Sequence, residues 1–194
     1  MHGGARMNRV AQAMSTVNRA DFLPPGARQH AEFDAPVAIG HGQTNSQPYT
    51  VAFMLNLLDV QAGHRVLDVG SGSGWTTALL AELGCEVTGV ELVPELVEFG
   101  RANLATAGYK GVEIHQATDG VFGLPELAPF DRILVSAEAD HIPQDLIDQL
   151  KIGGSMVIPV EGTMLHIERI SEGESAMTRH GLFRFVPLLR SRGD

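Results

Sequence analysis

The chain has 194 residues, of which 44% are hydrophobic, and its formal net charge is −9. This length is enough for one domain with a sizeable core, and the composition is ordinary for a globular protein. The acidic charge and the lack of a Lys/Arg cluster argue against non-specific nucleic-acid binding, and no apolar run approaches the roughly 20 residues of a membrane span. Cys85 is the single cysteine, which excludes an internal disulfide.

These features set our expectations about compartment and partners. The N-terminal stretch MHGGARMNRVAQAM lacks a continuous apolar segment, so no signal peptide is indicated and we expect a cytoplasmic protein. No two histidines have the spacing of a local metal motif, and we expect no metal site. We expect neither nucleic acid nor a membrane as partner, and we expect a monomer.

The first third of the sequence predicts two helices separated by irregular chain. Residues 8–23 carry apolar side chains at helical spacing, and the Pro24-Pro25-Gly26 stretch ends that helix. Residues 27–48 are expected to be irregular, and residues 49–59 (YTVAFMLNLLD) to form a buried helix.

From residue 65 onward, predicted strands alternate with predicted helices. The expected strands are 65–69, 86–90, 112–115, 132–136 and 155–160, with helices over 76–83, 94–108 and 143–152. Such alternation predicts parallel βαβ units in a doubly wound α/β sheet. Segments 165–170 and 182–187 have no helix between them and are expected to pair as a C-terminal antiparallel hairpin. We treat 1–194 as one domain, with an N-terminal helical extension over 8–60 and an α/β core over 61–194.

A glycine-rich loop follows the first strand of this core, in the stretch VLDVGSGSGW. Its glycines stand at every second position. The third glycine therefore comes one residue too early for the dinucleotide fingerprint G-x-G-x-x-G, and the loop lacks the Gly-Lys-Ser/Thr of a P-loop. Asp68 precedes the loop, and a carboxylate there would repel a pyrophosphate but suit a cationic ligand. Glu91 ends the next strand, where a carboxylate can bind both ribose hydroxyls, and Asp119 follows the third strand.

This arrangement resembles the S-adenosylmethionine site of class I methyltransferases, with their Rossmann-like sheet. The resemblance implies S-adenosyl-L-methionine as cofactor and S-adenosyl-L-homocysteine as product. Asp68 and the glycine loop would lie along the methionine end, Glu91 on the ribose and Asp119 on the adenine. The implied cofactor residues in this region are Asp68, Gly70, Ser71, Gly72, Gly74, Glu91, Leu92, Asp119 and Gly120. The alternatives are a tight turn for the glycines, an Asx-turn for Asp119 and helix-start packing for Trp75.

A second motif, IGHGQTNSQPY at residues 39–49, narrows the resemblance to the protein-L-isoaspartate (D-aspartate) O-methyltransferases. Further matches are AEFDAPVAIG, APFDRILVSA, IPQDLIDQLKIGGSMVIPV and FRFVPL, which together span nearly the whole chain. The family places a serine at the active site, here Ser46 in the acceptor-site loop 40–48. Residues Thr44, Asn45, Ser46 and Gln47 would also touch the cofactor. The implied reaction methylates the free carboxyl of L-isoaspartyl residues in damaged proteins or peptides.

The residue types of this loop suit the implied chemistry. A carboxylate that displaces a sulfonium methyl in line needs no general base; it needs orientation, partial dehydration and weak neutral donors. The Ser46 hydroxyl and nearby backbone N–H groups can supply these. The alternative for Ser46 is a helix N-cap, because Pro48 would occupy an early helix position.

The chain departs from the family pattern at several positions. Asn45 replaces a usual Ile, Asn18 replaces the Pro of a Val-Pro-Arg stretch, and Thr163 stands near a usual Gln. Two acids, Glu138 and Asp140, follow the fourth strand. These departures motivate an alternative function, a divergent relative that methylates another carboxylate on a peptide or small metabolite. A non-enzymatic module that binds the cofactor is a further alternative.

Overall fold

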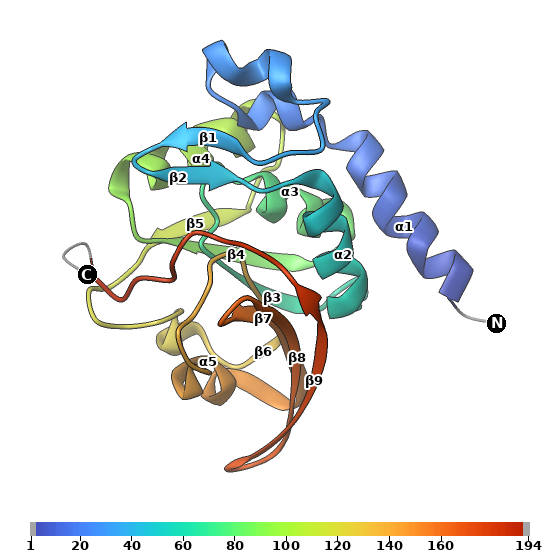
Figure 1. Ribbon diagram of the computed structural model, residues 1–194, viewed down its shortest axis with the longest axis vertical. Coiled ribbons are helices and arrows are strands. Elements are labelled where there is room, and N and C mark those ends of the chain that lie inside the picture. The colour runs from blue at the N-terminus through green and yellow to red at the C-terminus, as the bar shows by residue number, and fades with distance from the viewer. Residues whose placement is uncertain (1–2, 192–194) are drawn as a thin grey trace.

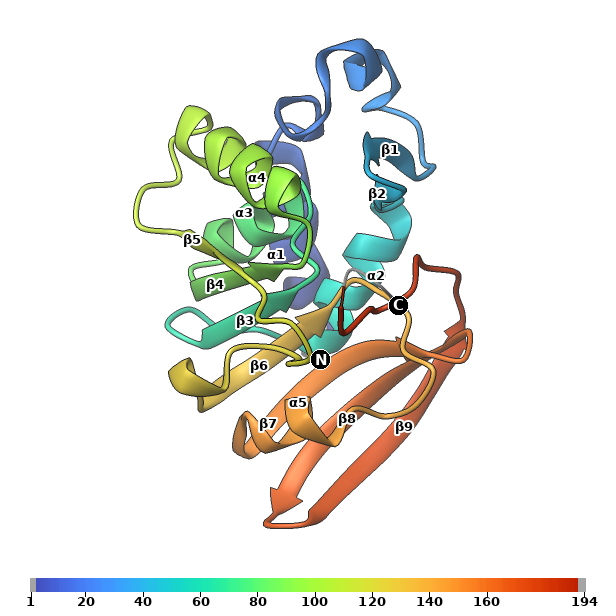
Figure 2. The same cartoon turned by 90° about the vertical axis from the view of Figure 1, so that its left-hand side faces the viewer.

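The computed structural model describes residues 3–191 of the chain, with side chains from residue 9 onward. Its centre is a seven-stranded sheet in the order β5-β4-β3-β6-β7-β8-β9 (Figures 1 and 2). In that order the strands are β5 (Glu113–Gln116), β4 (Glu86–Glu91), β3 (Arg65–Val69), β6 (Phe130–Val135), β7 (Leu150–Val160), β8 (Thr163–Ser171) and β9 (Glu174–Leu182). Pairs from β5 to β7 are parallel and the last two are antiparallel, as the sequence predicted.

Helices cover both faces of this sheet. The longer helices are α1 (Gly3–Thr16), α2 (Pro48–Leu58), α3 (Trp75–Glu82) and α4 (Pro94–Thr106), and they pack on one face. The short α5 (Gln144–Asp148) packs on the other face with the 3-10 helix η3 (Pro125–Leu127) and its neighbouring loop, as Figure 2 shows. None of the described helices is long and apolar enough to cross a membrane.

The N-terminal extension differs in detail from the prediction. The helix expected over 8–23 ends at Thr16, and the 3-10 helices η1 (Arg19–Phe22) and η2 (Pro25–His30) follow it. The stretch expected to be irregular also contains a small hairpin, β1 (Val37–Gly40) paired with β2 (Gln43–Asn45). Strands of three or four residues are too short for alternation to signal them in a sequence.

The predicted C-terminal hairpin is correct in kind and wrong in its second strand. β8 pairs with β9 at residues 174–182, and Gly173, with φ of 76°, lies in the turn that joins them. Residues 183–187, expected to form the strand, leave the sheet instead. Figure 1 shows this red C-terminal segment running back across the molecule.

The alternation of side chains along β3 decides what each residue of the strand can touch. Val66 packs into the core under the long helices, whereas Leu67 and Val69 join the core on the other face. Asp68 therefore points the same way as Val66, toward α3, and is fully buried. β4 lies on one side of β3 and β6 on the other, so the carboxyl ends of these strands surround the crevice where open α/β sheets bind ligands.

Gly100 of α4 allows the helix to approach the glycine loop closely. A Cβ at this position would lie 2.9 Å from the Gly72 carbonyl oxygen and 2.7 Å from Ile114 Cδ1. We expect Gly100→Ala to lower the free energy of unfolding by about 1–3 kcal/mol, since the clash outweighs the gain in helix propensity. Gly26→Ala is the control, because its Cβ would meet no atom within 4 Å. Chemical denaturation of both variants tests this, and equal stabilities would contradict it.

Candidate cofactor and acceptor site

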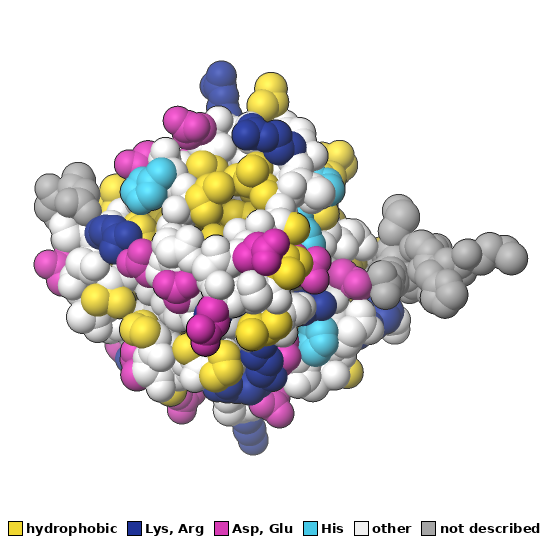
Figure 3. Space-filling view, turned by 90° about the horizontal axis from the view of Figure 1, so that it is seen from below, with side chains coloured by type: hydrophobic (Ala, Val, Ile, Leu, Met, Phe, Trp, Pro, Cys, Tyr) yellow, Lys and Arg dark blue, Asp and Glu magenta, His cyan; other side chains and the backbone are white. Residues whose placement is uncertain are grey.

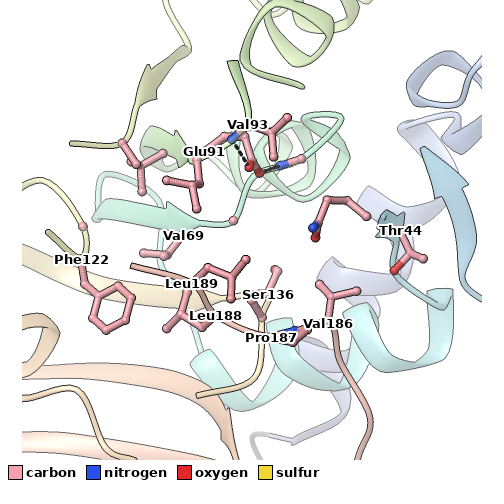
Figure 4. A pocket seen from close by; sticks show the side chains of 18 of the residues that line it. Thr44, Val69, Glu91, Val93, Phe122, Ser136, Val186, Pro187, Leu188 and Leu189 are labelled. Carbon is pink, nitrogen blue, oxygen red and sulfur yellow. Dashed lines mark hydrogen bonds between the residues drawn. The ribbon is translucent and has the colours of Figure 1, made fainter. Parts of the chain in front are cut away.

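A cavity of about 710 Å³ opens at the carboxyl ends of β3, β4 and β6. Its walls come from the glycine loop, from residues 90–93 after β4, and from residues 121–123 after β5. Ser136 and Ala137 follow β6, and residues 186–189 of the C-terminal segment complete the wall (Figure 4). The lining is largely apolar with a few polar groups, as is typical of a small-molecule site.

The glycine loop has a backbone that only glycine adopts easily. Gly70, Gly72 and Gly74 have φ of 75°, 51° and 85°. The N–H of Gly70 donates to the Val90 carbonyl at 2.9 Å, which ties the loop to β4. Gly70 and Gly72 line the cavity, whereas Gly74 caps the start of α3 and packs against α4. The glycines thus do more than make a tight turn, because two of them bring backbone directly to the cavity wall.

Glu91 holds the glycine loop in place while its carboxylate faces the cavity. Its Oε2 accepts from the N–H of Gly72 and its Oε1 from the N–H of Val93, both at 2.9 Å (dashed in Figure 4). The side chain is buried, and Leu92 beside it also lines the cavity. Each carboxylate oxygen has a second lone pair, so Glu91 can still accept from two ligand hydroxyls.

Asp68 lies beneath the glycine loop and does not line the cavity. Its Oδ2 accepts from the Thr77 hydroxyl at 2.6 Å, and its Oδ1 has no partner among the described residues. Burial raises the pKa of Asp68 to about 7, the Thr77 bond opposes this shift and the Glu91 charge adds to it. Ser71 in the glycine loop is also buried, and its hydroxyl has no hydrogen-bond partner within the described part of the chain.

Asp119, expected at the adenine end of the cofactor, lies outside this cavity. Asp119 is exposed and does not line the cavity, where Ala117, Val121 and Phe122 stand instead. The N–H of Gly120 donates to the Arg190 carbonyl at 2.9 Å, so this backbone is bound to the C-terminal segment. The structure therefore brings Glu91, Leu92 and the glycine loop together, but it does not bring Asp119 or Gly120 to the same wall.

The C-terminal segment closes one side of the cavity, which the sequence did not indicate. The N–H of Glu138 donates to the Val186 carbonyl at 2.8 Å, and the N–H of Leu188 to the Glu138 carbonyl at 2.7 Å. Arg190 bonds the Asp145 carboxylate at 2.8 Å and lies over the Phe122 ring at 4.1 Å. Leu188 and Arg190 are therefore bound to the loops after β6 and β5 and to α5.

The acceptor-site loop 40–48 faces the cavity from the other side. Ser46 lines a smaller pocket of about 350 Å³ together with Thr44, Gln47, Ser136 and residues 184–186. Thr44 and Ser136 line both this pocket and the cofactor cavity, and both also line a narrow gap between loop 40–48 and the glycine loop. Figure 4 shows Thr44 and Ser136 on different sides of the open space. Val186 also lines both, so the two pockets meet at Thr44, Ser136 and Val186.

Ser136 is a site residue that sequence reasoning missed. Its signal was available, because it is the first residue after β6 at the reversal of strand order, where ligands bind. The N-cap alternative for Ser46 is wrong, since Gln47 is the residue that precedes α2. Helix-start packing is confirmed for Trp75, which begins α3 and is 2% exposed.

A family model decides the affiliation of the chain. Residues 1–193 match the model described as Protein-L-isoaspartate(D-aspartate) O-methyltransferase (PCMT). The chain belongs to this family. It is 46% identical to a protein-L-isoaspartate O-methyltransferase of Methanopyrus kandleri, over 98% of this chain and 88% of that protein. It is 45% identical to one of Myxococcus xanthus, over 95% and 90% of the two chains.

A solved structure of the same family supports the fold. The Plasmodium falciparum protein-L-isoaspartate O-methyltransferase, crystallised with S-adenosyl-L-homocysteine, superposes with a TM-score of 0.82 at 28% identity. The match covers 95% of this chain and 91% of that one. The Rossmann-like methyltransferase fold expected from the sequence is thereby confirmed.

The departures from the family pattern lie away from the acceptor pocket. The Glu138 carboxylate accepts from the N–H of Gly162 at 3.1 Å, Asp140 is exposed and pairs with His141, and Thr163 is the first residue of β8. Glu138, Asp140 and Thr163 line neither the large cavity nor the smaller pocket that contains Ser46. Asn45 is 5% exposed and lines only the narrow gap between the loops.

Proposed function

We propose that this protein transfers the methyl group of S-adenosyl-L-methionine to the free carboxyl of L-isoaspartyl residues in proteins or peptides. The observation that carries the proposal is the junction of two pockets in a chain of this family. A cofactor cavity with a glycine loop and Glu91 meets the Ser46 pocket at Thr44 and Ser136. A sulfonium methyl in the first pocket and a carboxylate in the second can therefore meet in line.

Methyl transfer to an ionised carboxylate needs no base from the protein. A carboxylate oxygen forms a bond to the methyl carbon, the carbon–sulfur bond breaks, and its electron pair stays on sulfur. An anion and a sulfonium cation become a neutral ester and a neutral thioether. Charge is lost on the way to the transition state, so a largely apolar, water-excluding cavity favours the reaction. The backbone nitrogen of the following residue then attacks the ester carbonyl and expels methanol, which forms a succinimide. Its hydrolysis returns some normal aspartate.

The roles of individual residues follow from their places. The Gly70–Gly74 backbone would cradle the methionine end of the cofactor, and Glu91 would bind the ribose. Thr44 and Ser46 would orient the acceptor carboxylate with neutral hydroxyls. The buried Asp68 carboxylate would stabilise the positive charge of the cofactor from beneath the glycine loop. Val121 and Phe122, rather than Asp119, would enclose the adenine.

The remaining proposals concern partners and organisation. The net charge of −9 favours a peptide acceptor over nucleic acid. Figure 3 shows acidic side chains interspersed with basic ones and hydrophobic patches on the face seen from below. We also propose a cytoplasmic monomer whose extension and core form one domain.

A methylation assay with Ser46→Ala tests this function. The protein is incubated with methyl-labelled cofactor and an isoaspartyl peptide, with the normal aspartyl peptide beside it; base-labile label is expected on the isoaspartyl peptide alone. Loss of one hydrogen bond to a charged acceptor is worth about 1.5–3 kcal/mol, so kcat/KM should fall roughly 10- to 100-fold in Ser46→Ala.

Two controls accompany this variant. Ser175→Ala changes an exposed serine of β9 and should leave kcat/KM unchanged. Affinity for S-adenosylhomocysteine should stay within about threefold in both variants, as measured by calorimetry. Unlabelled isoaspartyl peptide despite cofactor binding would contradict the proposed acceptor, and full activity in Ser46→Ala would contradict the role of its hydroxyl.

A further inference from the structure

A buried arginine outside both pockets holds the acceptor-site loop. Arg19 of η1 is 6% exposed, and its guanidinium lies over the Trp75 ring at 5.2 Å. Its Nε donates to Asn45 Oδ1 at 2.8 Å, and its Nη2 donates to the Ser46 carbonyl at 3.1 Å. The other carbonyls that accept from this guanidinium belong to Ala31, Phe33, Ala35 and Asn45. One rigid cation thus joins residues 31–35 to loop 40–48.

Asn45 extends this contact to the glycine loop. Its Oδ1 accepts from Arg19, and its Nδ2 donates to Ser73 Oγ at 3.1 Å. Ser73 is 2% exposed, and its carbonyl accepts from Asn103 Nδ2 at 3.0 Å. A continuous chain of buried hydrogen bonds therefore runs from η1 through the acceptor loop to the cofactor loop and α4.

A second anchor fixes the same loop from the far side of Ser46. Asp34 accepts from Gln47 Nε2 at 3.0 Å and from the Tyr49 N–H at 2.8 Å. These two hydrogen bonds, with a smaller contribution from the Arg19 charge, lower the pKa of Asp34. Burial lowers the pKa of Arg19, and the Asp34 charge opposes that shift. Ser46 thus lies between a cationic anchor on residues 45–46 and an anionic anchor on residues 47–49.

We propose that Arg19 and Asn45 are positioning residues that fix the Ser46 loop relative to the bound cofactor; this rests on the function proposed above. Methyl transfer in line requires the acceptor oxygen and the methyl carbon to be placed to a fraction of an ångström. One partner is oriented by loop 40–48 and the other by the glycine loop. The Arg19–Asn45–Ser73 chain directly links the side chains of the two loops.

The test compares three variants that change this link in different ways. Arg19→Lys keeps a charge but loses the planar fork that reaches several carbonyls at once. Asn45→Ala removes the bonds to Arg19 and Ser73, whereas the two carboxylate oxygens of Asn45→Asp can accept from both Arg19 and the Ser73 hydroxyl. We expect kcat/KM for the isoaspartyl peptide to fall at least tenfold in Arg19→Lys and Asn45→Ala. Asn45→Asp should regain at least a third of wild-type kcat/KM, and affinity for S-adenosylhomocysteine should stay within about threefold throughout.

Arg65→Lys is the matched control for a merely structural effect. The Arg65 guanidinium also donates to two carbonyls, those of Leu127 and Pro129, and lies 5.4 Å from the Phe130 ring centre. It stands at the start of β3, at the opposite end from the site. The unfolding midpoint of the Arg65→Lys protein in denaturant should fall, while its kcat/KM stays within about twofold of wild type. A loss in Arg19→Lys no larger than in Arg65→Lys at equal stability, or wild-type kcat/KM in Asn45→Ala, would overturn the proposal.

A second readout keeps this inference separate from the proposed function. If wild-type protein binds S-adenosylhomocysteine but methylates no isoaspartyl peptide, the proposed function fails and hydrogen exchange decides the inference. S-adenosylhomocysteine should then slow amide exchange in residues 31–35, which line neither the cofactor cavity nor the gap between the loops. This slowing should be lost in Asn45→Ala. Equal slowing in both proteins, or none in wild type, would overturn the link.

Discussion

Glu91→Gln should weaken the binding of S-adenosylhomocysteine roughly 30- to 100-fold. The Glu91 carboxylate accepts two backbone N–H groups, from Gly72 and Val93, and each oxygen retains a lone pair toward the cavity. A glutamine has one oxygen and one NH₂, so its NH₂ must face one of these two N–H donors. The variant loses one charged hydrogen bond to the ligand, worth about 1.5–3 kcal/mol, and loosens the glycine loop as well. Isothermal titration calorimetry measures the change.

Glu98→Gln provides the comparison for this change. Glu98 is a glutamate on the exposed side of α4, where its side chain is 74% exposed and pairs with Arg101. Its replacement should leave the affinity for S-adenosylhomocysteine unaltered. Similar affinities in Glu91→Gln and Glu98→Gln would rule out a ligand role for Glu91 and leave it as a brace for the glycine loop.

Asp68→Asn should remove a pH dependence from the stability of the ligand-free protein. The pKa of Asp68 is about 7 in the folded state and near 3.9 in an unfolded chain. Between these values the folded protein keeps the proton that the unfolded chain has released. Folding then takes up about one proton, and the free energy of unfolding falls by about 1.4 kcal/mol per pH unit as the pH rises. This contribution is fully present below pH 4 and is lost above pH 7.

Denaturant titrations at several pH values between 4 and 8 measure this slope. Asn keeps an oxygen for the Thr77 hydroxyl, so Asp68→Asn should be more stable than wild type at pH 8 and lose the difference toward pH 4. Asp145→Asn is the comparison, because the Arg190 bond lowers the pKa of Asp145 and its stabilisation is lost only as the pH falls below about 4; between about pH 5 and 8 this variant should keep the slope of the wild type. Parallel pH profiles for wild type and Asp68→Asn would show that Asp68 is ionised throughout.

The same variant tests whether Asp68 senses the cofactor. An ammonium group of S-adenosylhomocysteine near the glycine loop would favour the ionised carboxylate, so binding near pH 7 should release a proton from the wild-type protein. Calorimetry in buffers of different ionisation enthalpy measures this release. Its absence, or an equal release in Asp68→Asn, would confine Asp68 to its contact with Thr77.

Local sequence patterns predicted the strands of the sheet and the residues that line the cavity at the ends of β3 and β4. Each strand from β3 to β7 was recognisable because apolar runs alternate with helical segments. The spaced glycines and Glu91 could be assigned because both follow strand ends, and parallel strands bring their carboxyl ends to one edge of the sheet. Ser136 could have been predicted by the same reasoning, because it directly follows β6.

The remaining features of the site could not be predicted, because they depend on contacts between residues that are far apart in the chain. The alternation along β3 turns Asp68 toward α3, and residues 187–189 enclose the cavity from the C-terminal segment. The sequence placed Asn45 in the acceptor-site loop, but it could not indicate that the side chain binds Arg19 and Ser73, which are 26 and 28 residues away. Local periodicity reports which face of an element is buried, but the choice of partner depends on how distant segments pack.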